Sequence, residues 1–483
     1  MRELGVGLVY WSALDPILSS PGSTVSVLEL EPQALWEKTC SPAGWRYRGN
    51  EGLLEHIASL PQAKLLHGVA HPVGGTVRDS VAHLPLLEQA VRRLDPAWVS
   101  EHLSFNRVQG PVEVEHAGFL LPPPQSLAAA RVATHNLNQF RNAIDRPVAF
   151  ETGVNYLRRQ NGELDDGDFF AAVAEGADSG ILLDLHNLWC NQRNGRQNVA
   201  EALARLPLER VWELHLAGGM QESGYWLDAH SGAVPPEVMD IASDLIPRLP
   251  NLGALIFEVL PEHLPRFGLD AVQRQIEALQ ALWRRRGPHL VRAQPRASSR
   301  GAPPTAADIA EVAHWERELV GALRAPATAF ATSAGLRDDP GCALLRMLVG
   351  EFRRANLART LHYTMTALLS GLGAPGTHHL LDAYFETQSP EPFAAVEADR
   401  FAQFLRARMP LRPAIPFLDE VLAFEHALVR ATVYGASSEL AWSADPIRMF
   451  DALDAGTLPR GLPQVFSTML ICAAESAAEG PTR

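Results

Sequence analysis

The sequence predicts a (β/α)8 TIM barrel over residues 1–286 and a mainly α-helical second domain over residues 306–483, with a possible small sheet. In the first part, short apolar runs alternate with longer amphipathic stretches, which is the pattern of such a barrel. No Gly-x-Gly-x-x-Gly motif follows the first run, which weakens the main alternative, an open doubly wound sheet. Residues 287–305 are rich in Pro, Gly, Ser and Arg and are expected to form a linker.

The apolar runs of the first domain are expected to form its eight strands. They are short and end in polar residues, as buried parallel strands do. The runs are Gly5–Val9, Val25–Leu30, Lys64–His67, Trp98–Leu103, Pro147–Glu151, Ile181–Leu185, Val211–Leu216 and Ala254–Val259. Helical periodicity fills intervals such as Ser80–Leu94 and Gln125–Ile144, and Asp270–Arg286 is expected to form the last barrel helix.

The second domain changes character, because its apolar residues follow the helical period almost throughout. Convincing strands are scarce before Arg430–Tyr434 and the segment behind it, so we expect any small sheet there. The adjacent pair His378–His379 has no supporting ligands nearby in the sequence and is assigned to a helix start or a loop. The predicted helices are Ala306–Leu323, Gly341–Leu357, Asn356–Leu369, Pro392–Arg408 and Ile415–Val433.

Composition excludes several classes of protein. The net charge of −13 argues against a general nucleic-acid-binding role. The four cysteines are scattered without a Cys-x-x-Cys pair, which argues against a disulfide framework and fits a reducing compartment. No signal peptide is recognisable, and no apolar run approaches the roughly 20 residues that cross a bilayer. We therefore expect a soluble, cytoplasmic protein that contacts neither nucleic acid nor membrane.

Polar residues gather where the apolar runs end. In a barrel these carboxyl ends meet at one rim, where active sites lie. Burying so many carboxylates and imidazoles together without cations would leave unpaired charge, which proteins avoid. The rim therefore predicts a site for two or three metal ions. The residues are His67, Glu101, His102, Glu151, Asp184, His186, Asn187, His215, Asp228, His230 and Glu258.

The types of ligand limit which metals fit the site, but they do not decide which reaction it catalyses. Imidazole and carboxylate without thiolate suit iron, manganese, zinc or cobalt. Two reactions stay open on these residues: attack of metal-bound hydroxide on a phosphate or amide, and activation of dioxygen by iron. A two-metal hydrolase or isomerase, such as a xylose isomerase-like enzyme or a phosphoesterase, is therefore the alternative to an oxidase. A metal-dependent binding protein without catalysis fits the number of rim ligands less well.

Several motifs follow one another in an order that resembles the multinuclear non-haem iron-dependent oxidative enzymes, the family of the methanobactin-forming oxidase. The motifs are HGV, SEHLSF, the Glu151-to-Tyr156 segment, LLDxxN, ELHLAGG, the DxH at Asp228 and the late strand with Glu258. The resemblance implies a TIM barrel that holds two or three iron ions of mixed valence, Fe(II) and Fe(III), with O2 as co-substrate. It also implies oxidative modification of a ribosomally synthesised precursor peptide (a RiPP), frequently at cysteine.

The resemblance assigns residues one by one. The iron-ligand positions fall on His67, His102, Glu151, Asn187, His215, Asp228, His230 and Glu258, and Asp184 is expected to ligate or to orient a ligand. Glu101, Asn155 and Tyr156 are the expected supporting residues of the catalytic site. Two positions depart from the family, because His186 and Thr152 stand where asparagine is usual. His186 could add a ligand or hold one in place, which leaves two or three ions open.

The second domain resembles, more weakly, the partner proteins that accompany these oxidases. The similarity lies in the helical segments at residues 392–408 and 413–434. It implies that residues 306–483 bind the leader of the precursor peptide and that no separate partner protein is required. The linker, residues 287–305, would hold the second domain at a roughly millimolar effective concentration beside the barrel. The alternative is a helical appendage that only stabilises or oligomerises the barrel.

Overall fold

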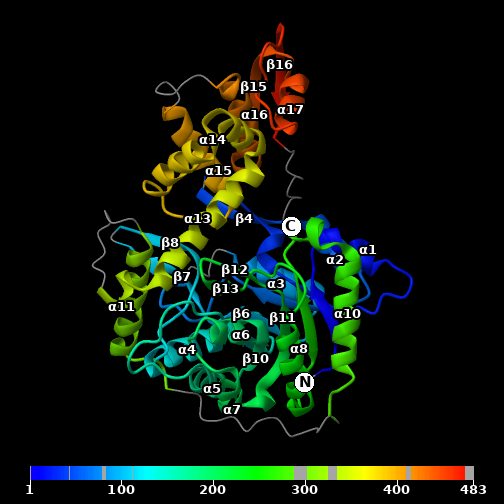
Figure 1. The fold of residues 1–483 in the computed structure, drawn as a ribbon, viewed down its shortest axis with the longest axis vertical. Coiled ribbons are helices and arrows are strands. Elements are labelled where there is room, and N and C mark those ends of the chain that lie inside the picture. Colours follow the sequence, from blue (N-terminus) through cyan, green and yellow to red (C-terminus); the bar gives the residue numbers. More distant parts are fainter. Residues whose placement is uncertain are drawn as a thin grey trace, which may run out of the picture.

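The computed structural model describes residues 2–42, 44–78, 83–110, 112–287, 302–324, 334–408 and 415–473. Eight parallel strands close into a barrel in the spatial order β1-β14-β11-β10-β9-β6-β5-β2. Each predicted strand run overlaps one of them, so the predicted (β/α)8 barrel is confirmed (Figure 1). Residues 288–301, most of the predicted linker, lie outside the described residues. The strands are β1 (Gly5–Val9), β2 (Val27–Leu30), β5 (Ala63–Gly68), β6 (Val99–His102), β9 (Val148–Glu151), β10 (Gly180–Asp184), β11 (Val211–Ala217) and β14 (Ala254–Glu258).

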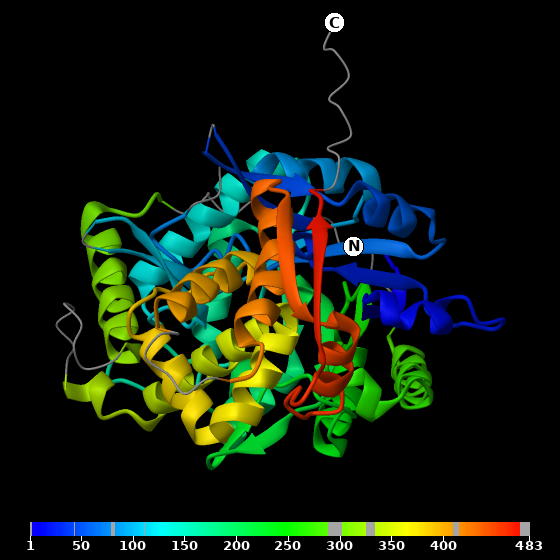
Figure 2. The ribbon, with the colours of Figure 1, turned by 90° about the horizontal axis from the view of Figure 1, so that it is seen from above.

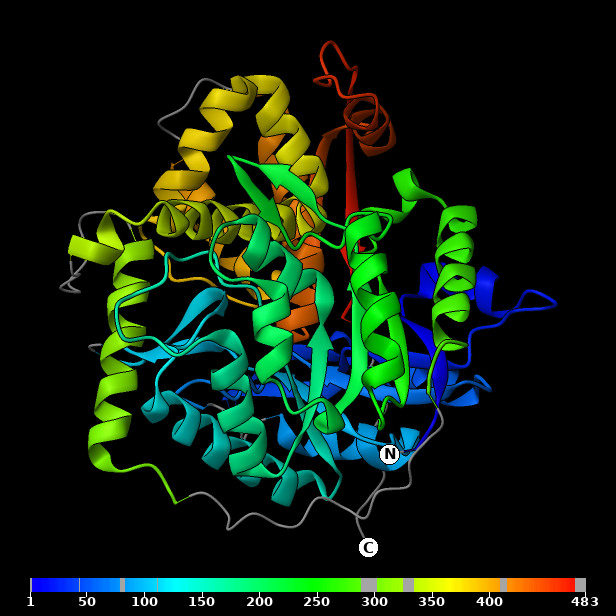
Figure 3. The same ribbon diagram turned by 60° about the horizontal axis from the view of Figure 1, so that its bottom comes forward.

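Helices cover the outside of the barrel, and three antiparallel hairpins extend the loops at the carboxyl ends of its strands (Figure 3). The helices are α1 (Asp15–Leu18), α2 (Glu51–Ser59), α3 (Leu84–Leu94), α4 (Leu127–Ile144), α5 (Asp166–Ala177), α6 (Leu185–Arg193), α7 (Val199–Arg205), α8 (Pro236–Leu245), α9 (Leu264–Phe267) and α10 (Leu269–Trp283). The hairpins are β3 (Trp36–Ser41) with β4 (Gly44–Gly49), β7 (Phe105–Gln109) with β8 (Val114–Leu121), and β12 (Met220–Glu222) with β13 (Tyr225–Leu227).

Alternation along the strands divides the barrel into an apolar base and a polar top. The lower inward positions form one apolar cluster that includes Val27, Leu65, Trp98, Ala149 and Ile256. The outward positions pack against the helices in the main core. Toward the carboxyl ends, the inward positions become polar, which places the functional side chains on a rigid, fully packed support.

The second domain is mainly helical, with a two-stranded antiparallel sheet near its end, as predicted (Figure 2). No helix in the described part of the chain is long and apolar enough to cross a membrane. The helices are α11 (Ala306–Leu323), α12 (Ala334–Arg337), α13 (Pro340–Thr360), α14 (His362–Phe385), α15 (Ala394–Arg408), α16 (Leu418–Tyr434) and α17 (Pro446–Asp454), and the sheet is β15 (Ser438–Ala444) with β16 (Gln464–Ile471).

Three details of this domain differ from the sequence-based expectation. Arg430–Tyr434 is the last turn of α16 rather than a strand, because Val429 and Val433 continue the buried helical face and Gly435 ends the helix with φ of 60°. The predicted helix across residues 356–369 is broken at Leu361, whose backbone (φ −119°, ψ 50°) is not helical. His378 and His379 lie inside α14, after its kink at Gly373, with both side chains exposed.

The start of the second domain packs on the barrel rather than on its own helices. Leu319 of α11 and Leu345 of α13 share a core with Phe105 and Leu121 of the β7–β8 hairpin. An ion pair between Arg131 and Asp308 fastens α11 to α4. A separate helical core, which includes Leu357, Leu368, Phe401 and Leu422, begins only in the second half of α13. In Figure 1, α13 accordingly runs from the barrel into the upper helices.

A buried ion pair holds α13 to α15 inside this second core. Arg353 Nε donates to Glu397 Oε1 at 2.7 Å, and both side chains are almost inaccessible to solvent. Glu397 Oε2 in turn accepts a hydrogen bond from the backbone N–H of Glu391 at 3.0 Å. Removing one member of such a pair is costly, because the remaining charge stays buried without compensation.

We predict that Arg353→Met lowers the local stability of α13 and α15 by about 3–5 kcal/mol. Arg354→Met, at the neighbouring but partly exposed ion pairs with Glu351 and Asp382, should cost about 1 kcal/mol or less. Hydrogen exchange of the amide groups in these helices, measured in the full chain, checks both values. Equal protection in the two variants would contradict the assigned role of the buried pair.

Candidate metal centre

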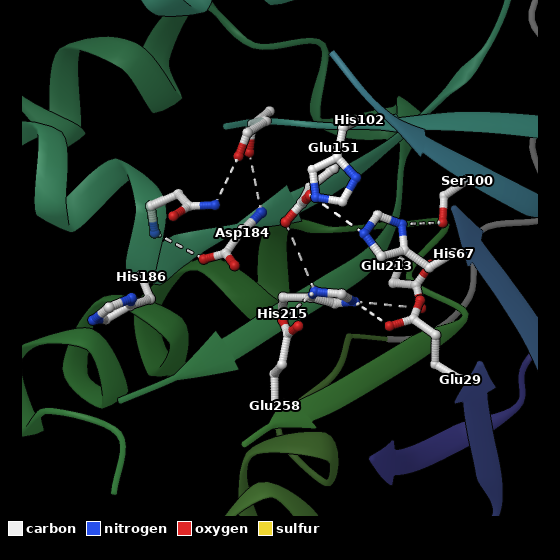
Figure 4. A network of polar contacts seen from close by, with 12 residues as sticks. Glu29, His67, Ser100, His102, Glu151, Asp184, His186, Glu213, His215 and Glu258 are labelled. Atoms are coloured by element: carbon white, nitrogen blue, oxygen red, sulfur yellow. Dashed lines mark hydrogen bonds and ion pairs between the residues drawn. The ribbon is translucent and has the colours of Figure 1, made fainter. Parts of the chain in front are cut away.

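Every barrel strand except β1 places a polar side chain inward at its carboxyl end. These side chains, which we call the polar ring, face one another across the top of the barrel (Figure 4). The registers explain this arrangement, because paired residues of neighbouring strands point to the same side: His67 pairs with Ser100, His102 with Glu151, and Asp184 with His215. The polar ring consists of Glu29, His67, His102, Glu151, Asp184, His215 and Glu258, and nearly all of its members are buried.

Two histidines and one glutamate form the first group of potential ligands. His102 Nδ1 donates to the carbonyl oxygen of Gly68 at 2.9 Å, and His67 Nδ1 lies 2.9 Å from Ser100 Oγ, whose own hydroxyl donates to the Leu66 carbonyl. Both imidazoles therefore direct Nε2 inward, at 2.7 and 3.3 Å from Glu151 Oε2. Two imidazole nitrogens and one carboxylate oxygen meet in this group.

Glu151 also belongs to a second group, with Asp184 and His215. Potential ligand atoms of these three residues all lie within 4.8 Å of one another. His215 Nδ1 is 3.9 Å from Glu151 Oε1 and 3.1 Å from Glu258 Oε2. Glu151 thus offers one carboxylate oxygen to each of the two groups.

A third group joins Asp184 to Asp228 and His230 from the loop behind β13. His230 Nε2 lies 3.0 Å from Asp228 Oδ1, and His230 Nδ1 lies 3.4 Å from Glu258 Oε1. His230 has φ of 44°, a left-handed backbone conformation that is costly for a residue other than glycine. The loop thus bears local strain while it directs both side chains toward the polar ring.

Asn187 joins the same region through the first turn of α6. Asp184 caps this helix, because its Oδ1 accepts from the Asn187 N–H at 2.8 Å. The Asn187 side chain donates to the Thr152 carbonyl at 3.3 Å, and Thr152 Oγ1 accepts from the Asp184 N–H. Thr152, one of the two departures from the family pattern, therefore fixes the start of α6. Asp184 Oδ2 and Asn187 Oδ1 stay available to a metal ion.

The residues fit metal ions by two independent observations. First, Asp184 Oδ2 and Asn187 Oδ1 are buried and have no hydrogen-bond partner among the described residues. Buried polar atoms are rarely left in this state unless a ligand satisfies them. Second, the nitrogen–oxygen distances near 3 Å match those between neighbouring ligands on one ion, roughly 3 Å for metal–ligand bonds of about 2.1 Å.

The electrostatic field of the polar ring favours cations. Burial alone lowers the pKa of His102, but the Glu151 carboxylate outweighs burial and raises this pKa to about 9. Burial also lowers the pKa values of His215 and His230. The nearby carboxylates outweigh burial and raise both pKa values well above the usual value. Burial and the neighbouring Asp228 and Glu151 raise the pKa of Asp184. Excess negative charge is thus concentrated where metal ions would sit.

Glu29 is a member of the polar ring that sequence reasoning missed. It forms an ion pair with His215 Nε2 at 2.8 Å, on the side of the imidazole away from Glu151 and Glu258. A second missed carboxylate, Glu213, lies one layer deeper and accepts from the Trp98 indole N–H at 2.8 Å. The available signal was strand alternation, since Glu213 is two residues before His215 and Glu29 is one residue before the end of its run.

His186 holds Asp228 and has no nitrogen left for a metal. The indole N–H of Trp226 donates to His186 Nε2 at 3.3 Å, and an indole can only donate. The proton of His186 must therefore lie on Nδ1, which donates to Asp228 Oδ1 at 2.8 Å. The question that this departure from the family pattern left open is answered by geometry: His186 orients a potential ligand.

The three predicted supporting residues, Glu101, Asn155 and Tyr156, differ in how they relate to the potential metal ligands. Tyr156 Oη accepts from the Asp228 N–H at 3.0 Å, so it positions the loop that carries Asp228 and His230. Asn155 Oδ1 accepts from the Leu157 N–H at 3.0 Å and orders the loop behind β9. Glu101 points to the opposite face of β6 from His102, where it accepts from the His71 N–H at 3.3 Å, and burial raises its pKa to about 7.

A cavity of about 1100 Å³ opens onto the polar ring. His67, His102, Glu151 and Glu258 line its floor together with Asp228 and His230 from the loop behind β13. The upper wall comes from the second domain, through residues of α13 and the segment before α15. The potential metal ligands are therefore accessible to a substrate through a space that both parts of the chain enclose.

The barrel is similar to solved structures of other enzymes, at low sequence identity. A xylose isomerase domain protein from Planctomyces limnophilus is 15% identical, with a TM-score of 0.37, and the match covers 58% of this chain and 96% of that chain. An L-ribulose 3-epimerase is 14% identical, with a TM-score of 0.33, over 72% of this chain and 98% of that chain.

Sequence comparison gives closer relatives. Residues 48–268 match the family model of the RiPP precursor modification enzyme MbnB/TglH/ChrH, a stretch that contains all the predicted metal ligands. A UPF0276 protein from Anaeromyxobacter sp. is 31% identical over 42% of this chain and 70% of its own length. A UPF0276 protein from Chromobacterium violaceum is 33% identical over 40% of this chain and 68% of its own length. Through its barrel, the chain belongs to the family of the UPF0276 proteins, and this part of the chain matches the model of the MbnB/TglH/ChrH RiPP precursor modification enzymes.

Proposed function

We propose that this protein is an iron- and O2-dependent oxidase that modifies a ribosomally synthesised precursor peptide, with cysteine as the residue modified. The convergence of imidazole nitrogens and carboxylate oxygens on the cavity floor carries the proposal. The match of residues 48–268 to the model of RiPP precursor modification enzymes supports the class of substrate. A donor set of imidazole and carboxylate, without thiolate from the chain itself, is the set that non-haem iron oxygenases use.

In this mechanism the three groups of potential ligands, drawn from the polar ring and from Asp228 and His230, would hold the iron ions, two or three in number. Bound iron supplies redox chemistry toward O2 and an attachment point for a substrate thiolate. The chain contributes the arrangement of the ligands. Gly68 and Ser100 fix the imidazoles of His102 and His67, Glu29 fixes that of His215, and His186 with Tyr156 fixes the carboxylate of Asp228.

The cavity contributes a surrounding for the reaction that is partly shielded from water. Its lining is mainly apolar, so charges on the floor act in a medium of low dielectric constant. The second domain closes the cavity from above, which supports a role for residues 306–483 in binding the precursor, with its leader on this domain. Fusion makes a separate partner protein unnecessary, because α11 and α13 are already packed on the barrel.

Glu29 gives a specific prediction, since a carboxylate that orients a ligating imidazole raises its basicity. Glu29→Gln should weaken iron binding by about 10–100-fold while the barrel stays folded. The control is Glu37→Gln, which removes an exposed carboxylate paired with Arg48 on the β3–β4 hairpin. Anaerobic titration with Fe(II), followed by metal analysis after gel filtration, measures the affinity. Unchanged affinity in Glu29→Gln would remove Glu29 from the site.

The proposed reaction is tested with the anaerobically purified full chain and a cysteine-containing precursor peptide encoded beside its gene. We expect bound iron and peptide-dependent consumption of O2. His102→Ala should lose most of the iron and the activity because it removes an Nε2 ligand, whereas His56→Ala, at an exposed helix position, should keep both.

The alternative chemistry would give a different result in the same experiment. Zinc or manganese as the sole functional metal, with turnover that does not consume O2, would contradict the oxidase and favour a two-metal hydrolase or isomerase. The same metal content in His102→Ala as in the unmodified chain would contradict the assignment of the first group of ligands.

A further inference from the structure

The cavity above the polar ring has a wall that the barrel does not supply. Helix α13 contributes Met347, Leu348, Glu351, Phe352, Ala355 and Arg359 to it, and we call the stripe of Leu348, Phe352, Ala355 and Arg359 the α13 face. We propose that the α13 face selects the peptide residue adjacent to the modified one and favours a bulky apolar side chain there. This inference rests on the proposed function and specifies the substrate that the same site takes.

The spacing of the α13 face shows that it is one surface of the helix. Its residues follow one another at intervals of four, three and four, which places them along a single stripe. The opposite side of the helix faces the second core through Arg353 and Leu357. The stripe is thus left to the cavity, and Phe352 is 39% exposed in it.

The helix that carries this stripe is held firmly at both ends. Its first turns pack in the core shared with the barrel loops, and Asp339 before it accepts from the Arg158 N–H at 2.9 Å. Its second half is tied to α15 by the buried Arg353 pair. Between these anchors the β8 strand meets it closely, since a Cβ on Gly118 would lie 2.8 Å from Val349 Cγ1. The wall is therefore rigid.

Two apolar side chains outside the α13 face also line the cavity. Met220, at the start of the β12–β13 hairpin, is 44% exposed, and Phe393 of the segment before α15 joins the lining. Large apolar side chains gathered around one opening mark a place where an apolar ligand is covered. Phe352 and Met220 would contact such a ligand directly.

The occupant that fits is an extended polypeptide with an apolar residue beside the reacting one. The cavity of about 1100 Å³ exceeds the usual range for small-molecule sites, roughly 300–1,000 Å³. The cavity continues without interruption from the α13 face to the polar ring. A peptide residue bound at the α13 face therefore places its neighbours toward the polar ring. Specificity would then depend on the peptide near the reaction as well as on its leader.

The test is selection from a phage-displayed library of peptides with a fixed central cysteine and randomised flanking residues. The bait is the full-length, iron-loaded protein under anaerobic conditions. The unmodified chain should enrich Leu, Ile, Met or Phe at a position next to the cysteine. Phe352→Asp should reduce this enrichment by roughly tenfold or more, because a charge replaces the apolar contact. Iron content should stay unchanged.

Leu369→Asp is the matched control, since Leu369 is 45% exposed on α14 and does not line the cavity. It should enrich the same peptides as the unmodified chain. Unaltered apolar enrichment in Phe352→Asp, or no apolar enrichment by the unmodified chain, would overturn the proposal. Iron-dependent oxidation that persists in either case would leave the proposed function standing. Apolar enrichment by a chain that neither binds iron nor consumes O2 would support the α13 face and contradict the oxidase.

Discussion

Mutual repulsion among buried carboxylates is the constraint on which the upper half of this barrel depends. Glu29, Glu151, Asp184, Asp228 and Glu258 approach one another where water cannot screen them. Three imidazoles are placed between them, and the pKa values of His102, His215 and His230 rise accordingly. Positive charge stabilises this space, and protonated imidazoles or metal ions shared between carboxylates can supply it.

The apolar base of the barrel makes this concentration of charge possible. Closed parallel strands keep each inward side chain at a fixed height, so the ligands need no ordering when metal or substrate binds. The supporting contacts come from backbone carbonyls, Ser100, Glu29 and His186, each of which constrains one potential ligand. Geometry that is set before binding is the main contribution a protein makes to redox chemistry at a metal.

Local patterns in the sequence were enough to predict the eight strands and the polar residues at their ends, because both depend on short-range periodicity. Glu29 was missed because it lies inside an apolar run and its partner His215 is far along the chain. The role of His186 depended on Trp226, which only tertiary structure brings to it. Arg430–Tyr434 was ambiguous because a short apolar run suits a strand or a helix turn. The dual packing of α13 has no local signature at all.

The central claim is that the polar ring binds iron, and anomalous X-ray diffraction tests it most directly. Crystals of the full chain loaded with Fe(II) without oxygen would be measured on both sides of the iron absorption edge. We predict anomalous density between His67, His102 and Glu151, and further density between Asp184 and the neighbouring His215 or His230. Iron-loaded crystals with no anomalous density inside the polar ring would contradict the account.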